Sequence, residues 1–269
     1  SAEAMTISAN NTYYIRNYKS NLYLDVAAPS YKELIQHSFM GGNNQRFVYQ
    51  NNTLKSVHTG SYVTTGANYA ADFPRAVVGS SLKISLSVNT DGTYCILKQD
   101  GNTWRALDVY NSTSVVGWAE YTASSSQKWV LEDGNQAEIA RGTYYIINAN
   151  SGKYLQLNET TGGLVQNTLN SGNNQKWEII KTSSGNYQIK TKSTKYTGYI
   201  NIGTDNYGVV NSSSMNIDIY ENDNGTYKLH MPNLSYCLVV QNASTSNLAK
   251  TIWYPYNNTY NEQWMFVKA

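Results

Sequence analysis

The chain has 269 residues, enough for one large domain or two of ordinary size. Only 14% of the residues are charged and the net charge is +2, so no charge pattern indicates nucleic acid or an anionic membrane as a partner. No apolar stretch of about 18 residues or more occurs, so insertion into a membrane is not predicted. The 24 tyrosines, together with many Asn, Ser, Thr and Gly residues, are typical of strands and turns.

The predicted strands in chain order show an internal duplication. The segment NTYYIRNYKSNLYLDV at 11–26 aligns without gaps with GTYYIINANSGKYLQL at 142–157. Both copies continue to similar endings, LIQHSFMGGNNQRF at 34–47 and LVQNTLNSGNNQKW at 164–177. The sequence therefore predicts two domains, 1–134 and 139–269, joined by the polar segment EDGNQAEIARG.

Each half contains three shorter repeats of roughly 40 to 48 residues. A repeat has a strand of the type Gly-Thr-Tyr-x-Ile, a turn, a strand like YLDV, a short strand like LIQ, and a Gln-x-Trp before the last strand. The middle repeat of each half keeps the strand alternation but has no Gln-x-Trp. Short alternating strands separated by Asn, Gly and Ser turns predict an all-β barrel or sandwich.

The closing motif recurs in four of the six repeats, as Gln127-Lys-Trp, Gln175-Lys-Trp, Glu262-Gln-Trp and, more weakly, Gln45-Arg-Phe. Three repeats of four strands that end in this motif, present twice, resemble the ricin-type β-trefoil lectin family over essentially the whole chain. The resemblance implies an all-β fold of two tandem β-trefoil domains, each with three pseudo-repeats.

The aromatic residue of each closing motif is predicted to belong to the core. Trp129, Trp177, Trp264 and Phe47 occupy the same place in their repeats, and one such ring buries roughly 150–250 Å². The preceding glutamine is predicted to bind loop backbone groups that would otherwise be buried without partners.

Recognition of a sugar requires a carboxylate acceptor, an amide and a flat aromatic ring. In the ricin-type pattern these are the Asp of the YLDV-like strand, an aromatic residue near the next short strand, and the Asn before the glutamine. In the first repeat the resemblance implies a site with Asp25, Asn44 and Gln45. His37 replaces the aromatic residue, Phe39 lies further along the chain, and Gln36 supplies an additional hydrogen bond.

The third repeat is predicted to contain the second site, with Asp108, Trp118, Ser126 and Gln127. Trp118 is expected to be an exposed stacking ring, because the residues around it contribute little to a core. Ser126 stands where the pattern has Asn, and its hydroxyl group has a shorter reach.

The second half is predicted to bind sugar less well. Gln156 replaces the Asp of the fourth repeat, although Asn174 and Gln175 remain. In the sixth repeat Val239 stands at the Asp position. A weaker site is considered there, formed by Trp253, Tyr254, Asn261 and Glu262, in which Glu262 supplies the missing carboxylate.

The only cysteines, Cys95 and Cys237, lie in different halves and are predicted to be buried free thiols. His37, His58 and His230 are not at metal-ligand spacing, and no nucleophile motif, phosphate loop or glycosidase carboxylate pair is evident. We therefore expect no catalysis, no cofactor and no metal site.

The resemblance implies a carbohydrate-binding lectin of the galactose or N-acetylgalactosamine type. Such a lectin binds glycans on glycoproteins or glycolipids as a haemagglutinin or as a targeting module, with a toxin or enzyme chain as a further partner. Secretion is expected for such a protein, although SAEAMTISAN at 1–10 is not an intact signal peptide. The alternative is a protein-binding β-trefoil, either a protease inhibitor or a toxin component whose sugar sites have decayed.

Overall fold

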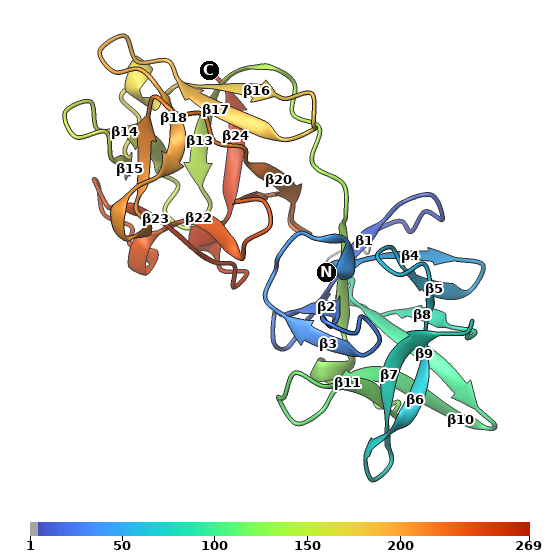
Figure 1. Ribbon diagram of the computed structural model, residues 1–269. Helices are drawn as coiled ribbons and strands as arrows, with labels where there is room; N and C mark the ends of the chain where they lie inside the picture. Colours follow the sequence, from blue (N-terminus) through green and yellow to red (C-terminus); the bar gives the residue numbers. More distant parts are fainter. Residues whose placement is uncertain (1–4) are drawn as a thin grey trace. The chain divides into compact units, whose positions relative to one another are not determined.

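The computed structural model describes residues 5–269 and consists of two compact units, the first ending at Asn135 and the second beginning at Gln136 (Figure 1). Within residues 5–269 the only helical segments are short 3-10 turns, and each unit contains one sheet of twelve strands. Three repeats of four strands form each unit. The predicted all-β fold of two β-trefoils is therefore confirmed, and we call the units the first and second trefoil.

The first trefoil contains strands β1 to β12 and two 3-10 turns. Their bounds are β1 Tyr13–Asn17, β2 Tyr23–Val26, β3 Leu34–His37, η1 Asn43–Gln45, β4 Arg46–Gln50, β5 Thr53–Ser56, β6 Tyr62–Ala70, β7 Phe73–Gly79, β8 Ser85–Val88, β9 Tyr94–Asp100, β10 Thr103–Val109, β11 Val116–Glu120, η2 Ser125–Gln127 and β12 Trp129–Asp133.

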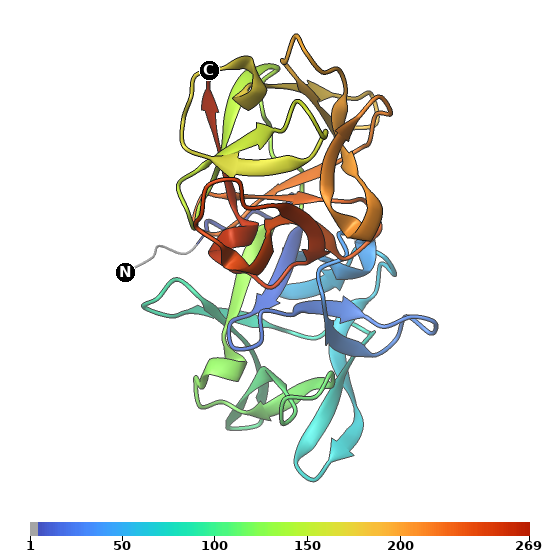
Figure 2. The same cartoon turned by 90° about the vertical axis from the view of Figure 1, so that its left-hand side faces the viewer.

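The strands of the first trefoil form a barrel and three hairpins. β1 pairs with β4 and with β12, so the first and last strands of the trefoil lie side by side. The hairpins β2–β3, β6–β7 and β10–β11 are joined to one another by single pairs, Glu33 with Val77, Ile35 with Val115 and Arg75 with Gly117. In two views the β6–β7 hairpin, in cyan, extends away from the rest of the first trefoil (Figure 1, Figure 2).

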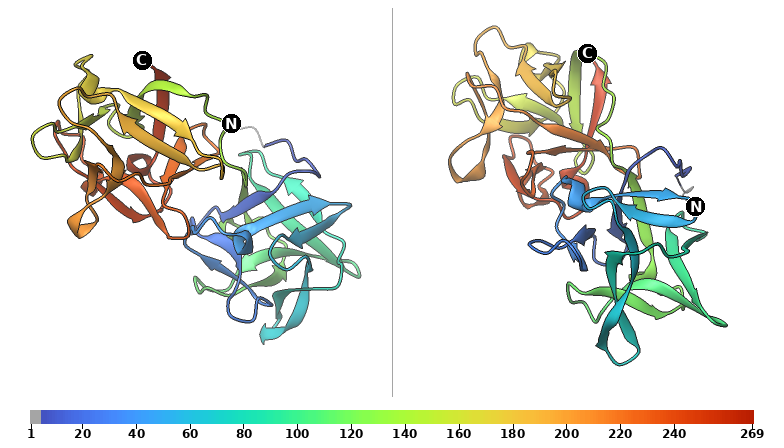
Figure 3. Two further views of the ribbon diagram at one scale, coloured as in Figure 1. Left: turned by 45° about the horizontal axis from the view of Figure 1, so that its top comes forward. Right: turned by 45° about the vertical axis from the view of Figure 1, so that its right-hand side comes forward.

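The second trefoil repeats this plan with strands β13 to β24. Their bounds are β13 Gly142–Asn148, β14 Tyr154–Leu157, β15 Leu164–Asn167, η3 Asn173–Gln175, β16 Trp177–Lys181, β17 Tyr187–Thr191, β18 Tyr199–Ile202, η4 Thr204–Asn206, β19 Gly208–Asn211, β20 Asp218–Glu221, β21 Tyr227–His230, β22 Tyr236–Val240, η5 Gln241–Ala243, β23 Thr251–Pro255, η6 Tyr260–Glu262 and β24 Trp264–Lys268. β13 and β24, in green and red, lie side by side, as β1 and β12 do in the first trefoil (Figure 3).

The aromatic residues of the closing motifs lie in the cores, as predicted. Phe47 and Trp129 are fully buried in the core of the first trefoil, and Trp177 and Trp264 in that of the second. Each indole N–H also donates a hydrogen bond to a backbone carbonyl oxygen of the second strand in its repeat, at 2.8–3.0 Å. These rings therefore fix the position of the strand in which the Asp of each site is expected.

The two cysteines are free and buried, as predicted. Burial raises the pKa of the Cys237 thiol well above its ordinary value, so this thiol stays protonated and unreactive at neutral pH.

Candidate functional site

The structure brings together the predicted polar residues of the first repeat. Asn44 Nδ2 donates to Asp25 Oδ1 at 2.9 Å, and Gln45 Nε2 donates to Asp25 Oδ2 at 3.0 Å. Asp25 is only 4% exposed. Since a carboxylate has about four acceptor positions, Asp25 keeps lone pairs for a ligand hydroxyl after these two bonds are made.

The glutamine of the closing motif connects this carboxylate to the loop behind it. Gln45 Nε2 also donates to the Ser38 carbonyl oxygen at 2.9 Å, and Gln45 Oε1 accepts the Met40 N–H at 2.8 Å. Gln127 makes the corresponding bonds to Glu120 O and Thr122 N, at 2.8 and 2.9 Å. The predicted role of the glutamine, as the partner of loop backbone groups, is therefore confirmed.

Burial is the largest influence on Asp25 and raises the pKa of its carboxyl group. The hydrogen bonds from Asn44 and Gln45, and the nearby imidazole of His37, act in the opposite direction. Asp25 is therefore a largely buried acceptor, and a hydrogen bond from a hydroxyl group to its carboxylate is of the charge-assisted, stronger kind.

The pleat of the β2–β3 hairpin determines which neighbours share a face with Asp25. Residues that are directly paired on antiparallel strands point to the same side of the sheet. Asp25 is paired with Ile35, so His37 is on the Asp25 face and is exposed. Gln36 is paired with Leu24 and points to the opposite face. His37 therefore remains a candidate for this site, whereas the assignment of Gln36 to it is wrong.

The Asp108 carboxylate of the third repeat is held differently. Gln127 Nε2 donates to Asp108 Oδ2 at 3.1 Å, as in the first repeat. Asp108 Oδ1 accepts the backbone N–H of Val109 at 2.7 Å. Among the described residues, Ser126 makes no hydrogen bond to Asp108, so the serine does not take the part that Asn44 plays beside Asp25. Instead, its carbonyl oxygen accepts Asn17 Nδ2 at 2.9 Å.

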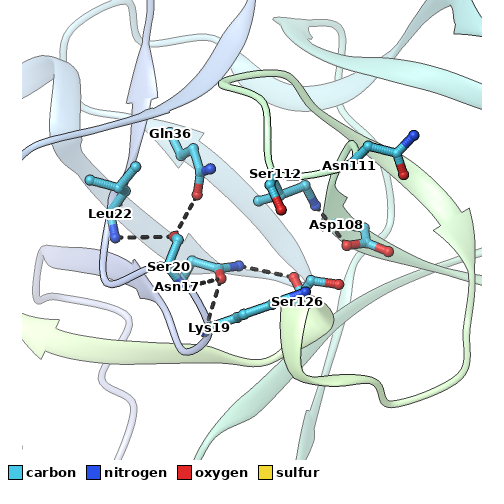
Figure 4. Close-up of a pocket in the computed structure, with 10 residues that line it drawn as sticks. Asn17, Lys19, Ser20, Leu22, Gln36, Asp108, Asn111, Ser112 and Ser126 are labelled. Carbon is cyan, nitrogen blue, oxygen red and sulfur yellow. Dashed lines mark hydrogen bonds between the residues drawn. The ribbon is translucent and has the colours of Figure 1, made fainter.

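A pocket of about 470 Å³ opens beside Asp108. This volume is within the usual range of small-ligand sites, roughly 300–1,000 Å³. The pocket lies between the β10–β11 hairpin and the turn that joins β1 to β2, and Figure 4 shows the residues around it. They are Asn17, Lys19, Ser20, Leu22, Gln36, Asp108, Val109, Asn111, Ser112 and Ser126.

The expectation that Trp118 is an exposed stacking ring is wrong. Asp108 is paired with Gly117, whereas Trp118 is paired with Leu107, so the indole and the carboxylate point to opposite faces of the hairpin. Trp118 is fully buried in the core, and its Nε1 donates to the Thr64 carbonyl oxygen at 3.2 Å. Trp118 was assigned to the site because it lies near Asp108 in the sequence. Side chains on a strand alternate between the two faces of the sheet, and this alternation places the two residues on opposite faces.

Trp253 is assigned wrongly for the same reason. It is paired with Leu238, while Ile252 is paired with Val239, the residue at the Asp position. The Trp253 ring is fully buried, and its Nε1 donates to the Asn201 carbonyl oxygen at 3.1 Å.

Gln36 and Phe39 have structural positions that the sequence did not indicate. Gln36 Nε2 donates to the Thr113 carbonyl oxygen at 2.7 Å, and Gln36 Oε1 accepts the Ser20 hydroxyl at 2.6 Å. Gln36 therefore contributes to the wall of the Asp108 pocket. Phe39 is fully buried, with its ring centroid 4.9 Å from that of Tyr14, and cannot stack on a ligand.

The fourth repeat has a neutral copy of the Asp25 arrangement. Gln175 Nε2 donates to Gln156 Oε1 at 2.9 Å, and Asn167 Nδ2 donates to the same oxygen at 3.2 Å. The acceptor is therefore occupied and carries no charge. The weak or absent sugar binding expected of this repeat stays a prediction.

In the sixth repeat Glu262 does not supply the missing carboxylate. Its side chain is buried, Oε2 accepts the Asn257 N–H at 2.6 Å, and burial raises its pKa to about 7. Asn261 Nδ2 donates to the Val240 carbonyl oxygen at 2.9 Å, so this amide also belongs to the scaffold. Tyr254, which is 52% exposed, is the one member of this predicted set whose ring is available to a ligand.

The part of the pocket wall that comes from the first repeat is not marked by any motif near Asp108 in the sequence. Asn17, Lys19 and Ser20 lie far from Asp108 in the sequence, and the closure of β1 on β12 brings them close to it. The duplication did contain a signal, because Asn148 and Ser151 of the second half repeat Asn17 and Ser20. Only the pseudo-threefold geometry relates that turn to the carboxylate of another repeat.

Within residues 5–269 no group of three or more His, Cys, Asp and Glu side chains is placed to hold a metal ion. No helix in the same range is long and apolar enough to cross a membrane.

Two trefoils in tandem, each closed by buried aromatic residues, define a β-trefoil protein, and comparisons with known proteins agree. Residues 125–210 match the family described as "Ricin-type beta-trefoil lectin domain-like". The chain is similar to a mosquitocidal holotoxin, with a TM-score of 0.72 and 18% identity over 99% of this chain and 35% of the toxin chain. It thus spans about a third of that toxin. Comparison with curated protein sequences finds no match.

Two further structures show weaker similarity. A ricin B-like lectin of Macrolepiota procera, solved in complex with lactose, has a TM-score of 0.45 and 18% identity over 49% of this chain and all of that lectin. A non-toxic homologue of type II RIPs from Momordica charantia, in complex with α-methyl-D-galactoside, has a TM-score of 0.38 and 15% identity over 97% of this chain and 98% of that one.

The resemblance to ricin-type β-trefoil lectins, first inferred from the Gln-x-Trp motifs, is therefore confirmed by the family match and the shared fold. These similarities show the β-trefoil fold over the chain and a match to a lectin-like domain family over residues 125–210.

Proposed function

We propose that the chain is a lectin that binds glycans through the first trefoil, with Asp25 and Asp108 as the acceptors of sugar hydroxyl groups. The hydrogen bonds from Asn44 and Gln45 to Asp25 are the observation that carries this proposal. Two amides hold a nearly buried carboxylate in a fixed orientation, although the fold itself does not require a charge there. The neutral Gln156 and the apolar Val239 at the same position of other repeats support this argument.

Galactose and N-acetylgalactosamine are the proposed sugar class, and this choice follows from the resemblance to ricin-type lectins. In the first site, Asp25 accepts hydroxyl protons, and the Asn44 amide and the exposed imidazole of His37 are the proposed further hydrogen-bonding groups. A shallow site of this kind is weak, and a millimolar dissociation constant corresponds to about −4 kcal/mol. Two sites on one trefoil increase the avidity for a surface that carries many copies of the sugar.

The biological role that fits such binding is attachment to cell-surface glycoproteins or glycolipids. We place the chain outside the cell, as a haemagglutinin-like protein or as the targeting module of a toxin or enzyme. Similarity of fold over 99% of this chain to a third of a mosquitocidal holotoxin supports the second possibility. The chain itself is proposed to be non-catalytic.

The second trefoil favours a different function, the binding of protein. Its third repeat has Val239 in place of the carboxylate, and its first repeat has an amide that is already hydrogen-bonded. A trefoil that keeps the scaffold without the acidic acceptors fits contact with a partner chain of a toxin or with a protease.

A glycan array on the intact chain, followed by haemagglutination with and without galactose, tests the main proposal. Asp25→Ala and Asp108→Ala are each expected to reduce binding, and the double variant to abolish it. Asp91→Ala is a suitable control, because this carboxylate pairs with Lys128 in the same trefoil and does not line the pocket. Unchanged binding by the double variant would show that these are not the sugar sites, and inhibition of a protease panel would favour the protein-binding alternative.

A further inference from the structure

The Asp108 pocket differs from the Asp25 site in having a lysine in its wall and no aromatic ring among its lining residues. We propose that this pocket selects acidic glycans, meaning sugars with a carboxylate or sulfate group, and that Lys19 is the residue that binds the acidic group. The inference rests on the proposed lectin function and specifies the ligand class of one of its two sites.

The turn that carries Lys19 is anchored to the other wall of the pocket. Asn17 is almost fully buried, and its Oδ1 accepts the backbone N–H groups of Lys19 and Ser20, both at 3.1 Å. Asn17 Nδ2 donates to the Ser126 carbonyl oxygen at 2.9 Å. One side chain thus fixes the backbone of Lys19 relative to the closing motif of the third repeat. In Figure 4 the Lys19 side chain points toward Ser126.

The charge of Lys19 has no counterion among the described residues. Neighbouring Lys128 is neutralised by Asp91, with a Nζ to Oδ2 distance of 3.1 Å, and it also lies over the Tyr18 ring. Lys19 is exposed, lines the pocket, and forms no ion pair within residues 5–269. A cation in this position attracts an anionic group of a ligand whose hydroxyl groups bind at Asp108.

The remaining walls explain why a charge is needed. The pocket is lined by amide, hydroxyl and backbone groups together with the aliphatic side chains of Leu22 and Val109. Because no ring stacks on the sugar, a neutral sugar gains the hydrogen bonds from its hydroxyl groups to Asp108 and, beyond these, only neutral polar contacts that compete with water. A charge-assisted hydrogen bond is roughly twice as strong as a neutral one, so an acidic group compensates for the missing ring.

The second trefoil provides a natural comparison for this lysine. Asn148 and Ser151 hold the corresponding turn as Asn17 and Ser20 do, with Asn148 Oδ1 accepting the Asn150 N–H at 3.1 Å. Asn150 replaces Lys19 there, and that turn faces the repeat in which Val239 has replaced the carboxylate. Of these two turns, the one that faces a carboxylate (Asp108) therefore carries a lysine, and the one that faces Val239 does not.

The experiment uses the full chain with Asp25→Ala, so that the Asp108 pocket is measured alone. Binding of lactose, 3′-sialyllactose and 3′-sulfolactose is measured by calorimetry for this background, and after addition of Lys19→Asn, the residue that the same turn has in the second trefoil. We expect the background to bind both acidic ligands more tightly than lactose. Lys19→Asn should reduce acidic binding about tenfold and leave lactose unchanged.

Lys83→Asn is the matched control, because Lys83 is an exposed lysine of the first trefoil outside the pocket. Lys83→Asn should change neither the affinity for the acidic ligands nor the affinity for lactose. Adding Asp108→Ala should remove binding of all three ligands. If Lys19→Asn and Lys83→Asn bind the acidic ligands equally, the assignment of Lys19 is wrong while the lectin proposal stands. If the wild-type chain binds none of the three ligands and no other glycan, both proposals fail.

Discussion

The third repeats of the two trefoils share the same scaffold but differ in the polar residues that a sugar site needs. Trp129 and Trp264 are both buried, and each indole donates to the carbonyl oxygen of an equivalent leucine, at 3.0 and 2.8 Å. The pair Asp108 and Gln127 in the first trefoil is replaced by Val239 and Glu262 in the second. The core was therefore retained while the site changed.

The difference between these two repeats shows that the closing glutamine has two roles, one in binding the loop backbone and one in binding the Asp. Its carbonyl oxygen accepts loop N–H groups, which every repeat with the motif requires. Its amide group donates one hydrogen bond to a loop carbonyl oxygen and a second one to the Asp, and only this second bond belongs to a sugar site. Glu262 retains an acceptor for the loop, through its bond from the Asn257 N–H, and it stands beside an apolar residue rather than a carboxylate. A glutamate is tolerated at this position because the Asp has been lost.

Introducing a carboxylate at position 239 while Glu262 is kept should therefore cause the largest loss of stability among the variants considered. Val239→Asp places an acid in a site that is 4% exposed, on the strand β22 that packs against the η6 turn containing Glu262. We expect a loss of about 3–5 kcal/mol, because a buried carboxylate without a donor is strongly destabilising. Urea unfolding of the full chain at pH 7 measures the loss, with hydrogen exchange of second-trefoil peptides to locate it.

Adding Glu262→Gln to Val239→Asp should recover much of this loss, since the new amide donates to the introduced carboxylate as Gln127 does to Asp108. A coupling energy of roughly 0.5–3 kcal/mol between the two changes is expected. Strict additivity would show that the two positions do not form one unit.

Glu262 alone should make the second trefoil sensitive to pH. Burial raises the pKa of this carboxyl from 4.5 to about 7, so the folded state prefers the protonated form. Protonated Glu262 therefore contributes fully to the stability of the fold below pH 4.5. This contribution is lost as the pH rises to about 7, and the total change in the free energy of unfolding is ~3 kcal/mol. Glu262→Gln should remove this dependence. Hydrogen exchange of second-trefoil peptides between pH 4 and 8, with first-trefoil peptides as internal control, gives the result.

Introducing the glutamate of the second trefoil into the first trefoil tests whether the glutamine is needed where the Asp is present. Gln127→Glu removes the N–H that donates to Asp108 and places two carboxylates at the 3.1 Å separation of the present hydrogen bond. We expect destabilisation of about 1–3 kcal/mol at pH 7 and reduced sugar binding by the Asp108 pocket. Both effects should decrease at acidic pH, where one carboxyl is protonated. A variant with wild-type stability at every pH would contradict the role assigned to Gln127.

The repeated features of the fold could be predicted from the sequence, because repetition makes them visible. The closing aromatics and the Asp–Asn–Gln set of the first repeat each lie within one repeat, and the duplication is visible because its two copies align without gaps. Trp118 and Gln36 were misassigned because strand pairing, and not distance along the chain, decides which face a residue joins. Lys19 was missed because it reaches the Asp108 pocket only after the trefoil has closed.

The smallest expected effect concerns Trp118, and it distinguishes a core residue from a stacking platform. Trp118→Phe removes the hydrogen bond from Nε1 to the Thr64 carbonyl oxygen and part of a fully buried ring. Stability should fall by about 1–2 kcal/mol, while the affinity of the Asp108 pocket for glycans stays unchanged, since the ring points away from that carboxylate. Calorimetric titration in the Asp25→Ala background, together with urea unfolding, separates the two quantities. A large loss of glycan affinity with little loss of stability would restore Trp118 to the binding site and would contradict the strand pairing on which the site assignment depends.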